Sequence, residues 1–164
     1  MALPNKVLPG FSAALYCQSG SSPTALTNTQ LATLANVAAI AVSGNLLPVE
    51  AIPAFGQDDA VANFAVAGSR QSDKIPTQSA PTSMTITAAW NPSDTNLLLM
   101  RADAYSGVID RTFVISATDG TNIVYYAFNG RVSEFQIDAS PNAEAKCTFT
   151  IHPRGNQYGW SNNV

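Results

Sequence analysis

The sequence predicts a mainly β protein with antiparallel strands and one flanking α-helix. Apolar and polar residues alternate through the C-terminal third, which is the period of a half-buried strand. Asp-Gly and Asn-Gly dipeptides, at 119–120 and 129–130, punctuate that alternation as hairpin turns do. Upstream of both, the segment 93–107 carries apolar residues at helical spacing. A chain of 164 residues is long enough for a substantial core, and one domain over 1–155 is expected.

The C-terminal strands are expected at 111–118, 123–128, 131–138 and 145–152, forming an antiparallel meander. Both dipeptides are expected to be tight turns, because Asp, Asn and Gly readily adopt positive φ. Alternation is cleanest in the last segment, where Cys147, Phe149 and Ile151 share one phase. The segment 123–128 is apolar on both phases, so both of its faces are expected to be covered.

One strand is expected at 84–90, just before the helix. Ser93 or Asp94 can cap the first turn of that helix, and Gly107 can end it in the left-handed conformation. Its apolar stripe is expected to lie over one face or end of the sheet.

The N-terminal half is harder to interpret. Residues 11–17 alternate as a strand does. The segment 29–42 has helical spacing but ends in an apolar run that a buried strand could also use; its alanine content favours a helix. Residues 48–81 are expected to form a long inter-strand loop with a weak strand at 62–67. Loops of this length are usually functional or ordered by a partner.

Composition bears on the class of protein. Only 12% of residues are charged against 46% hydrophobic, which favours a subunit whose faces neighbours cover, although a monomer with a polar uncharged surface also fits. Eight Lys and Arg stand against eleven Asp and Glu without clustering, which argues against a nucleic-acid-binding surface. The N-terminus lacks the features of a signal peptide, and no apolar stretch is long enough for a membrane anchor, so synthesis in the cytosol is expected.

Residue chemistry predicts no enzyme, no cofactor and no metal site. His152 is the only histidine and falls on the outward phase of its strand, so a surface position is expected. Cys17 and Cys147 fall on apolar phases without metal-ligand spacing and are expected to be buried free thiols. Asp58 and Asp59 are adjacent, so on an extended chain their carboxylates point in opposite directions and cannot flank one sugar bond.

A sugar-stacking platform is the main alternative for the aromatic residues. Alternation sends Tyr125 and Tyr126 to opposite faces, which favours core or interface roles. The full set considered is Tyr105, Tyr125, Tyr126, Phe128, Tyr158 and Trp160.

Several motifs in order carry a family resemblance. They are the helix start N-P-S-D-T-N-L-L-L-M-R, the Asp-Gly turn, F-N-G-R-V, and the closing A-K-C-T-F-T-I-H-P-R-G. Over about 47–155 the chain resembles the tail tube (major tail) proteins of long-tailed bacteriophages. That resemblance implies an antiparallel β-sandwich or flattened barrel flanked by one helix. It also implies stacked hexameric rings around a channel through which DNA is delivered.

The resemblance further implies a virion protein present in the host cytoplasm during assembly. Its partners would be copies of itself and the tape measure and tail completion proteins, while DNA passes without specific binding. The alternative function is that of a monomeric carbohydrate-binding β-sandwich module in a phage tip or surface adhesin.

The family's long loop generally joins one ring to the next. The resemblance therefore implies that the corresponding loop of this chain contacts the next ring. The residues it implicates are Phe55, Asp58, Asp59, Phe64, Arg70, Asp73 and Lys74. Glu134 and Asp138, on the polar phase of the meander, are candidates to face the channel. The segment 156–164 is expected to be a C-terminal arm.

Overall fold

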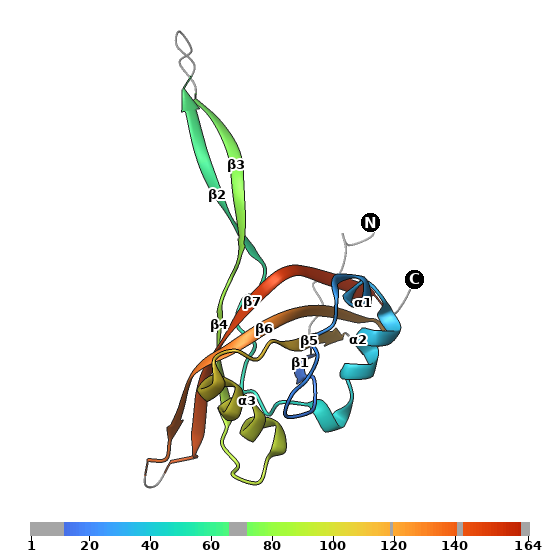
Figure 1. Ribbon diagram of the computed structural model, residues 1–164, viewed down its shortest axis with the longest axis vertical. Coiled ribbons are helices and arrows are strands. Elements are labelled where there is room, and N and C mark those ends of the chain that lie inside the picture. The colour runs from blue at the N-terminus through green and yellow to red at the C-terminus, as the bar shows by residue number, and fades with distance from the viewer. Residues whose placement is uncertain (1–11, 66–71, 119, 141–142, 162–164) are drawn as a thin grey trace, which may run out of the picture.

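The chain is described by a computed structural model that covers residues 12–65, 72–118, 120–140 and 143–161. The prediction of a mainly β protein is confirmed (Figure 1). The strands are β1 (Ser12–Cys17), β2 (Gln57–Ala65), β3 (Ser72–Pro81), β4 (Met84–Ala89), β5 (Arg111–Thr118), β6 (Ile123–Asp138) and β7 (Lys146–Ser161). The helices are α1 (Asn28–Leu31), α2 (Leu34–Ile40), the single 3₁₀ turn η1 (Ser43–Asn45) and α3 (Thr95–Ser106).

One curled sheet of five antiparallel strands forms the body, in the order β1-β5-β6-β7-β4. The segment 46–50 runs between its two edge strands. Leu47 N donates to Leu15 O of β1 at 2.9 Å, and Glu50 N donates to Thr87 O of β4 at 2.9 Å. The expected flattened barrel therefore arises from a single sheet whose edges are joined by an extended segment. Both edges gain backbone partners within the chain, which protects them from open-edge pairing.

Asn129-Gly130 is not a turn, and this corrects the predicted meander. β6 runs unbroken through both residues, and Gly130 pairs with Pro153 of β7. A Cβ on Gly130 would lie 2.9 Å from Ile151 Cγ2, so glycine serves close packing here. Asn129 accepts from Thr112 Oγ1 at 2.7 Å and donates to Leu26 O at 2.7 Å. Hydrogen bonding by the Asn129 side chain and close packing around Gly130 therefore explain why these two residues occur in the middle of a strand.

The β5–β6 hairpin is present where the Asp-Gly dipeptide predicts it. Thr118 pairs with Ile123, and Gly120 has a φ of 91°, in the region that favours glycine. Asp119 lies outside the described residues.

Both faces of the central strands are covered by this chain itself. The inner face packs Phe113, Phe128 and Phe149 into the main core. On the outer face, α1 and α2 bury a second cluster in which Val37 contacts the layer formed by Val114 and Ala127. Within the doubly apolar segment 123–128, this chain therefore buries Ala127 and Phe128 on opposite faces, whereas 123–125 are half-buried and Tyr126 is exposed. The helical interpretation of 29–42 is confirmed, with the helix divided at Thr33.

α3 forms as its capping residues predict. The Asp94 carboxylate accepts from the amides of Asn96 and Leu97 at 2.9 and 3.1 Å, and Gly107 ends the helix with a φ of 66°. Leu97 and Met100 enter the main core. One turn later, Asp103 forms a buried ion pair with Arg111 of β5, which fastens the helix to the sheet.

Two expected irregular segments are regular in the structure. Within 48–81, β2 and β3 form an antiparallel hairpin that projects from the body (Figure 1). The backbone of 156–161 continues β7 and pairs with β6, in place of the separate arm expected there.

Candidate assembly surfaces

The β2–β3 hairpin is the most exposed element. Its pairing extends from Gln57 opposite Pro81 to Ala65 opposite Ser72, with a register shift between Ala60 and Val61. Apart from the half-buried Pro81, the described side chains of the ribbon are exposed and include polar residues such as Asp58 and Lys74 as well as apolar residues such as Val61 and Ile75. Isolated two-stranded hairpins are only marginally stable in water, so an extended ribbon of this kind gains stability from a partner.

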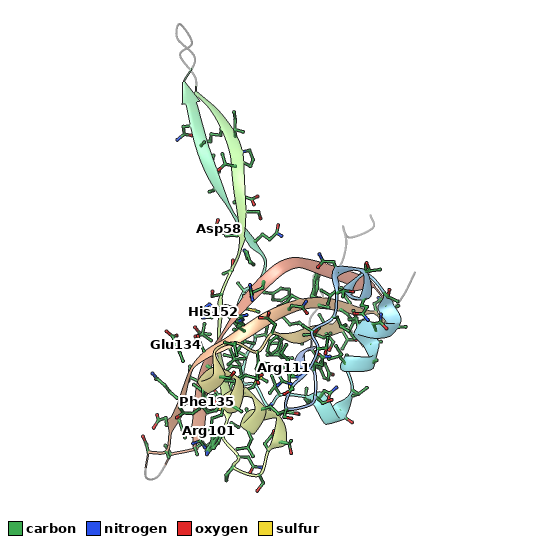
Figure 2. The ribbon with its side chains drawn as sticks, viewed as in Figure 1. Asp58, Arg101, Arg111, Glu134, Phe135 and His152 are labelled. Atoms are coloured by element: carbon green, nitrogen blue, oxygen red, sulfur yellow. The ribbon has the colours of Figure 1, made fainter. Side chains whose placement is uncertain are left out.

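The residues predicted for ring stacking divide into those on the ribbon and those at its root. Asp58, Asp59 and Lys74 lie exposed on the hairpin, and Figure 2 places Asp58 on its lower part. Phe55 lies at the root, where its ring centroid is 5.2 Å from that of Tyr126 and its side chain packs against the main core. The position of Phe55 suits an anchor between hairpin and body.

The remaining predicted ring-stacking residues are described less fully. Phe64 and Asp73 occupy paired positions near the far end of the ribbon, and their side chains lie outside the described part of the chain. Arg70 lies outside the described residues.

A polar face lies on the outside of β4, β7 and the middle of β6. Thr85 is exposed and pairs with Thr150, which is buried at 7% accessibility, and the half-buried Thr87 pairs with the half-buried Thr148. The alternate positions of the same strands are buried in the core. The two hydroxyls of the first pair are 3.4 Å apart. The half of the outer face near α1 and α2 is covered by those helices, so this hydroxyl-rich half is the polar remainder of the sheet.

Glu134 and Asp138 lie in different parts of β6. Glu134 adopts a φ of 57° at an irregularity between Ser133 and Gln136, and its carboxylate accepts from Thr150 Oγ1 at 3.1 Å. It therefore belongs to the polar face. Asp138 lies at the end of β6, where it accepts from Ser140 Oγ at 2.7 Å.

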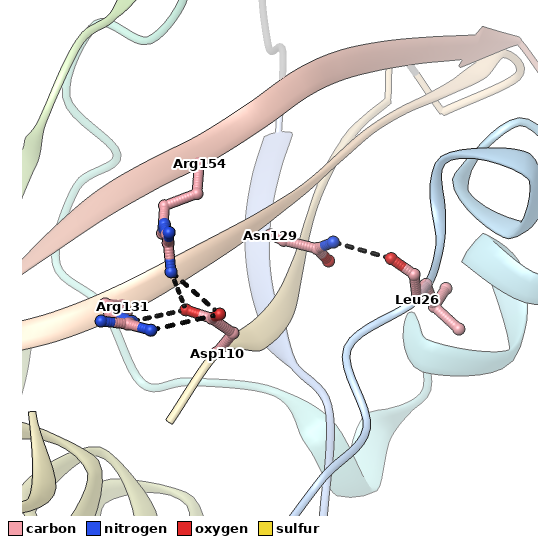
Figure 3. A network of polar contacts seen from close by, with 5 residues as sticks. All are labelled: Leu26, Asp110, Asn129, Arg131 and Arg154. Carbon is pink, nitrogen blue, oxygen red and sulfur yellow. Dashed lines mark hydrogen bonds and ion pairs between the residues drawn. The ribbon is translucent and has the colours of Figure 1, made fainter. Parts of the chain in front are cut away.

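An ion-pair network that the sequence pattern did not suggest joins three elements near this face (Figure 3). Asp110 Oδ1 accepts from Arg131 Nε at 2.6 Å, and both carboxylate oxygens accept from Arg154 Nη1, at 3.1 and 3.0 Å. The hydrogen bond from Arg131, and then that from Arg154, hold the pKa of Asp110 below its ordinary value. Arg154 is 44 residues from Asp110 in sequence, so only the sheet register brings them together.

The arrangement around His152 does not match a catalytic triad. Nδ1 lies 2.8 Å from Ser83 Oγ and Nε2 lies 2.7 Å from Ser133 Oγ, whereas a triad histidine turns one nitrogen toward a carboxylate. Among the described residues, no three or more His, Cys, Asp or Glu side chains are grouped to hold a metal ion. No helix in the described part of the chain is long and apolar enough to cross a membrane.

The two cysteines are buried free thiols, as predicted. Burial raises the pKa of Cys17 to about 12, and burial also raises the pKa of Cys147. Neither thiol is suited to nucleophilic chemistry, which requires a thiolate.

The aromatic residues considered for sugar stacking are separated by the fold. Phe128 is in the main core, whereas Tyr125 packs beside the α1–α2 cluster on the other face. Tyr105 lies on α3 and Tyr126 contacts Phe55. The side chains of Tyr158 and Trp160 lie outside the described part of the chain.

Comparison with known proteins supports a tail-tube-like fold. No protein-family model matches the chain, and no curated protein matches it significantly in sequence. Among solved structures, a chain of the anti-feeding prophage baseplate, a six-fold symmetrised assembly, matches with a TM-score of 0.64 and 10% identity over 100% of both chains. A chain of the anti-feeding prophage cap, which terminates its tube, matches with a TM-score of 0.62 and 13% identity over 98% of this chain and 95% of that one.

The SPP1 tail tube matches with a TM-score of 0.54 and 11% identity, over 93% of this chain and 77% of that chain. At these identities the similarity establishes the fold alone. The chain therefore has a fold shared with phage tail and tail-like assemblies, as its sequence resemblance predicts.

Proposed function

We propose that this protein is a structural subunit of a phage-type tail tube, in which hexameric rings stack around a channel that delivers DNA. The observation that carries the proposal is the full-length fold match to a six-fold symmetrised tail-like assembly. The projecting hairpin supports it, because an extended ribbon away from the body suits contact between copies. In this proposal the hairpin joins successive rings, with Asp58, Asp59 and Lys74 among its contact residues.

The polar face of β4, β6 and β7 is proposed to line the channel, with Glu134 at its edge. Its hydroxyl groups hydrogen-bond without carrying charge, so they do not hold a polyanion by counterion release. Arg131 and Arg154 are the nearby cations, and both are paired with the Asp110 carboxylate. This pairing reduces the positive potential that passing phosphates meet.

The proposed subunit is non-enzymatic and belongs to the virion tail, with the host cytoplasm as its site of assembly. Its partners are other copies of itself and, at the two ends of the tube, tape measure and tail completion proteins. Asp138, exposed at the end of β6, is proposed for the rim of the channel.

Negative-stain electron microscopy of the concentrated purified protein tests this proposal, with light scattering as the measure of mass. Rings or filaments are expected, whereas a carbohydrate-binding module would stay a single chain. Replacing 57–81 by a short Gly-Ser link should leave the circular dichroism of the body intact and abolish stacking. Tubes formed by that variant would show that the hairpin does not join rings, and a wild-type protein that stays single at all concentrations would refute the tube.

A further inference from the structure

Exposed apolar side chains lie on α3, on the segment that directly follows it, and on the far part of β6. They are Leu98, Tyr105, Val108 and Ile137, with 41, 79, 68 and 42% of their surfaces accessible. We call these residues the α3 ridge. Clusters of exposed apolar side chains at this level mark interaction surfaces more often than isolated ones do.

The ridge has a defined shape. The Arg101 guanidinium lies 5.7 Å from the centroid of the Tyr105 ring, a cation–π distance that restrains the ring. Beside it, Ala104, Tyr105, Glu134 and Phe135 line a shallow cleft of about 220 Å³. Tyr and Arg side chains are enriched among the residues that contribute most of the binding energy of protein interfaces.

The hairpin carries the complementary surface. Val61 is 53% and Ile75 is 51% exposed, although both are large apolar residues on a regular ribbon. They cannot reach the ridge of their own chain. Figure 1 shows the hairpin projecting away from the body, whereas α3 lies on the opposite part of the body, where Figure 2 labels Arg101 and Phe135.

We propose that the β2–β3 hairpin of one copy packs on the α3 ridge of the next copy. The inference rests on the proposed tube function and names the surface that receives the hairpin. Each apolar surface then covers the other. The contact joins two different surfaces, so it repeats head to tail and continues along an axis, as stacked rings require.

Charge supports this choice of occupant. The hairpin carries the exposed pair Asp58 and Asp59 near its root and exposed Lys74 nearer its far end. The ridge carries Arg101 on α3 and Glu134 at the rim of the cleft, both exposed. Asp58 or Asp59 can therefore pair with Arg101 beside the ridge, and Lys74 can pair with Glu134, and such charge pairs would fix the orientation of the hairpin on the ridge.

Disulfide trapping between copies tests the contact directly. Val61→Cys is combined with Val108→Cys, and the matched control combines Val61→Cys with Val42→Cys. Val42 is a good control because it is also an exposed valine that follows a helix, 46% accessible, but it lies beside α2. The native thiols are buried and cannot contribute to cross-linking. Mild oxidation of assembled protein should give a ladder of covalent multimers for the first pair only.

A substitution pair measures the energetic role of the ridge. Val108→Asp should raise the protein concentration at which rings or filaments appear by about tenfold or more, the scale of a central interface residue. Val42→Asp adds the same charge outside the ridge and should leave that concentration unchanged. Circular dichroism of both variants checks that the fold is retained.

The outcomes separate this inference from the tube itself. If tubes form but the control pair cross-links as well, or neither pair does, the hairpin packs elsewhere and the inference is overturned while the tube stands. If Val108→Asp leaves assembly unchanged and instead weakens binding of a different tail protein, the ridge receives that protein and the inference is likewise overturned. If the wild-type protein never assembles, both the proposed tube function and the hairpin–ridge contact are refuted.

Discussion

Replacing Asp103 by alanine should strongly destabilise the protein, because it leaves a buried guanidinium without its carboxylate. Arg111 Nε donates to Asp103 Oδ2 at 2.5 Å and Nη2 donates to Oδ1 at 3.0 Å. Arg111 Nη1 also donates to the Gly20 carbonyl at 2.9 Å and to the Gln18 carbonyl. The side chains of the pair are 0% and 1% accessible, so water cannot replace either partner.

The expected magnitude follows from that burial. Removing one member of a buried ion pair costs about 3–5 kcal/mol. Total stabilities of domains are about 5–15 kcal/mol, so Asp103→Ala should remove a large part of the unfolding free energy. The double variant Asp103→Leu with Arg111→Met removes both charges and should lose only about 1–2 kcal/mol, mainly from the carbonyls that Arg111 no longer satisfies.

Urea unfolding followed by circular dichroism measures these differences, with the slope checked to be the same in each variant. A double-mutant cycle of Asp103→Leu, Arg111→Met and their double variant then gives the coupling between the two side chains. An Asp103→Ala variant within about 1 kcal/mol of wild type would refute the reasoning, and so would a double variant whose loss equals the sum of the single losses. Because this pair fastens α3 to β5, its loss should also weaken assembly through the α3 ridge.

Other perturbations test further parts of the structure. Gly130→Ala should cost about 1–3 kcal/mol in urea unfolding, because its Cβ would lie 2.9 Å from the branched Ile151 side chain; a neutral result would refute the close packing. The pKa of Asp110 is lowered from 3.8, so its ion pairs stabilise the fold above about pH 4 and that contribution is lost as the pH falls through the lowered value. Between pH 7 and pH 3, wild type should therefore lose more stability than Asp110→Asn, although partial exposure keeps the difference small. Cys17 and Cys147 should react with a thiol reagent only after unfolding in guanidinium chloride, since burial raises both pKa values; rapid labelling of the native protein would contradict this.

Local sequence signals succeeded where neighbouring residues decide the structure. Asp94 and Gly107 set the ends of α3 through bonds and backbone preferences within one helical turn. Alternation located β1, β5 and β7, together with the buried cysteines of β1 and β7, because the period of a strand is independent of what packs against it.

Local signals failed where distant segments compete for the same residues. Asn129-Gly130 has the composition of a tight turn, yet Thr112 and Leu26 bind the asparagine side chain and Ile151 fills the space beside the glycine. The hairpin at 57–81 was also missed as regular structure, since its prolines and polar residues resemble a loop. Both strands of the hairpin are edge strands that bury little surface. The alternation of apolar and polar residues that is typical of a core strand is therefore weak in their sequence.

The sequence by itself determined the mainly β class, the position and caps of α3, the burial of both cysteines and the order of motifs that resembles tail tube proteins. Tertiary structure alone decided that β6 is one continuous strand, that 46–50 joins the edges of the sheet, and that Asp110 pairs with Arg131 and Arg154. It also decided that the β2–β3 hairpin projects from the body on the side away from α3. The physical reason is range: caps and alternation act over a few residues, whereas sheet register brings together groups separated by tens of residues, and no local pattern encodes that register.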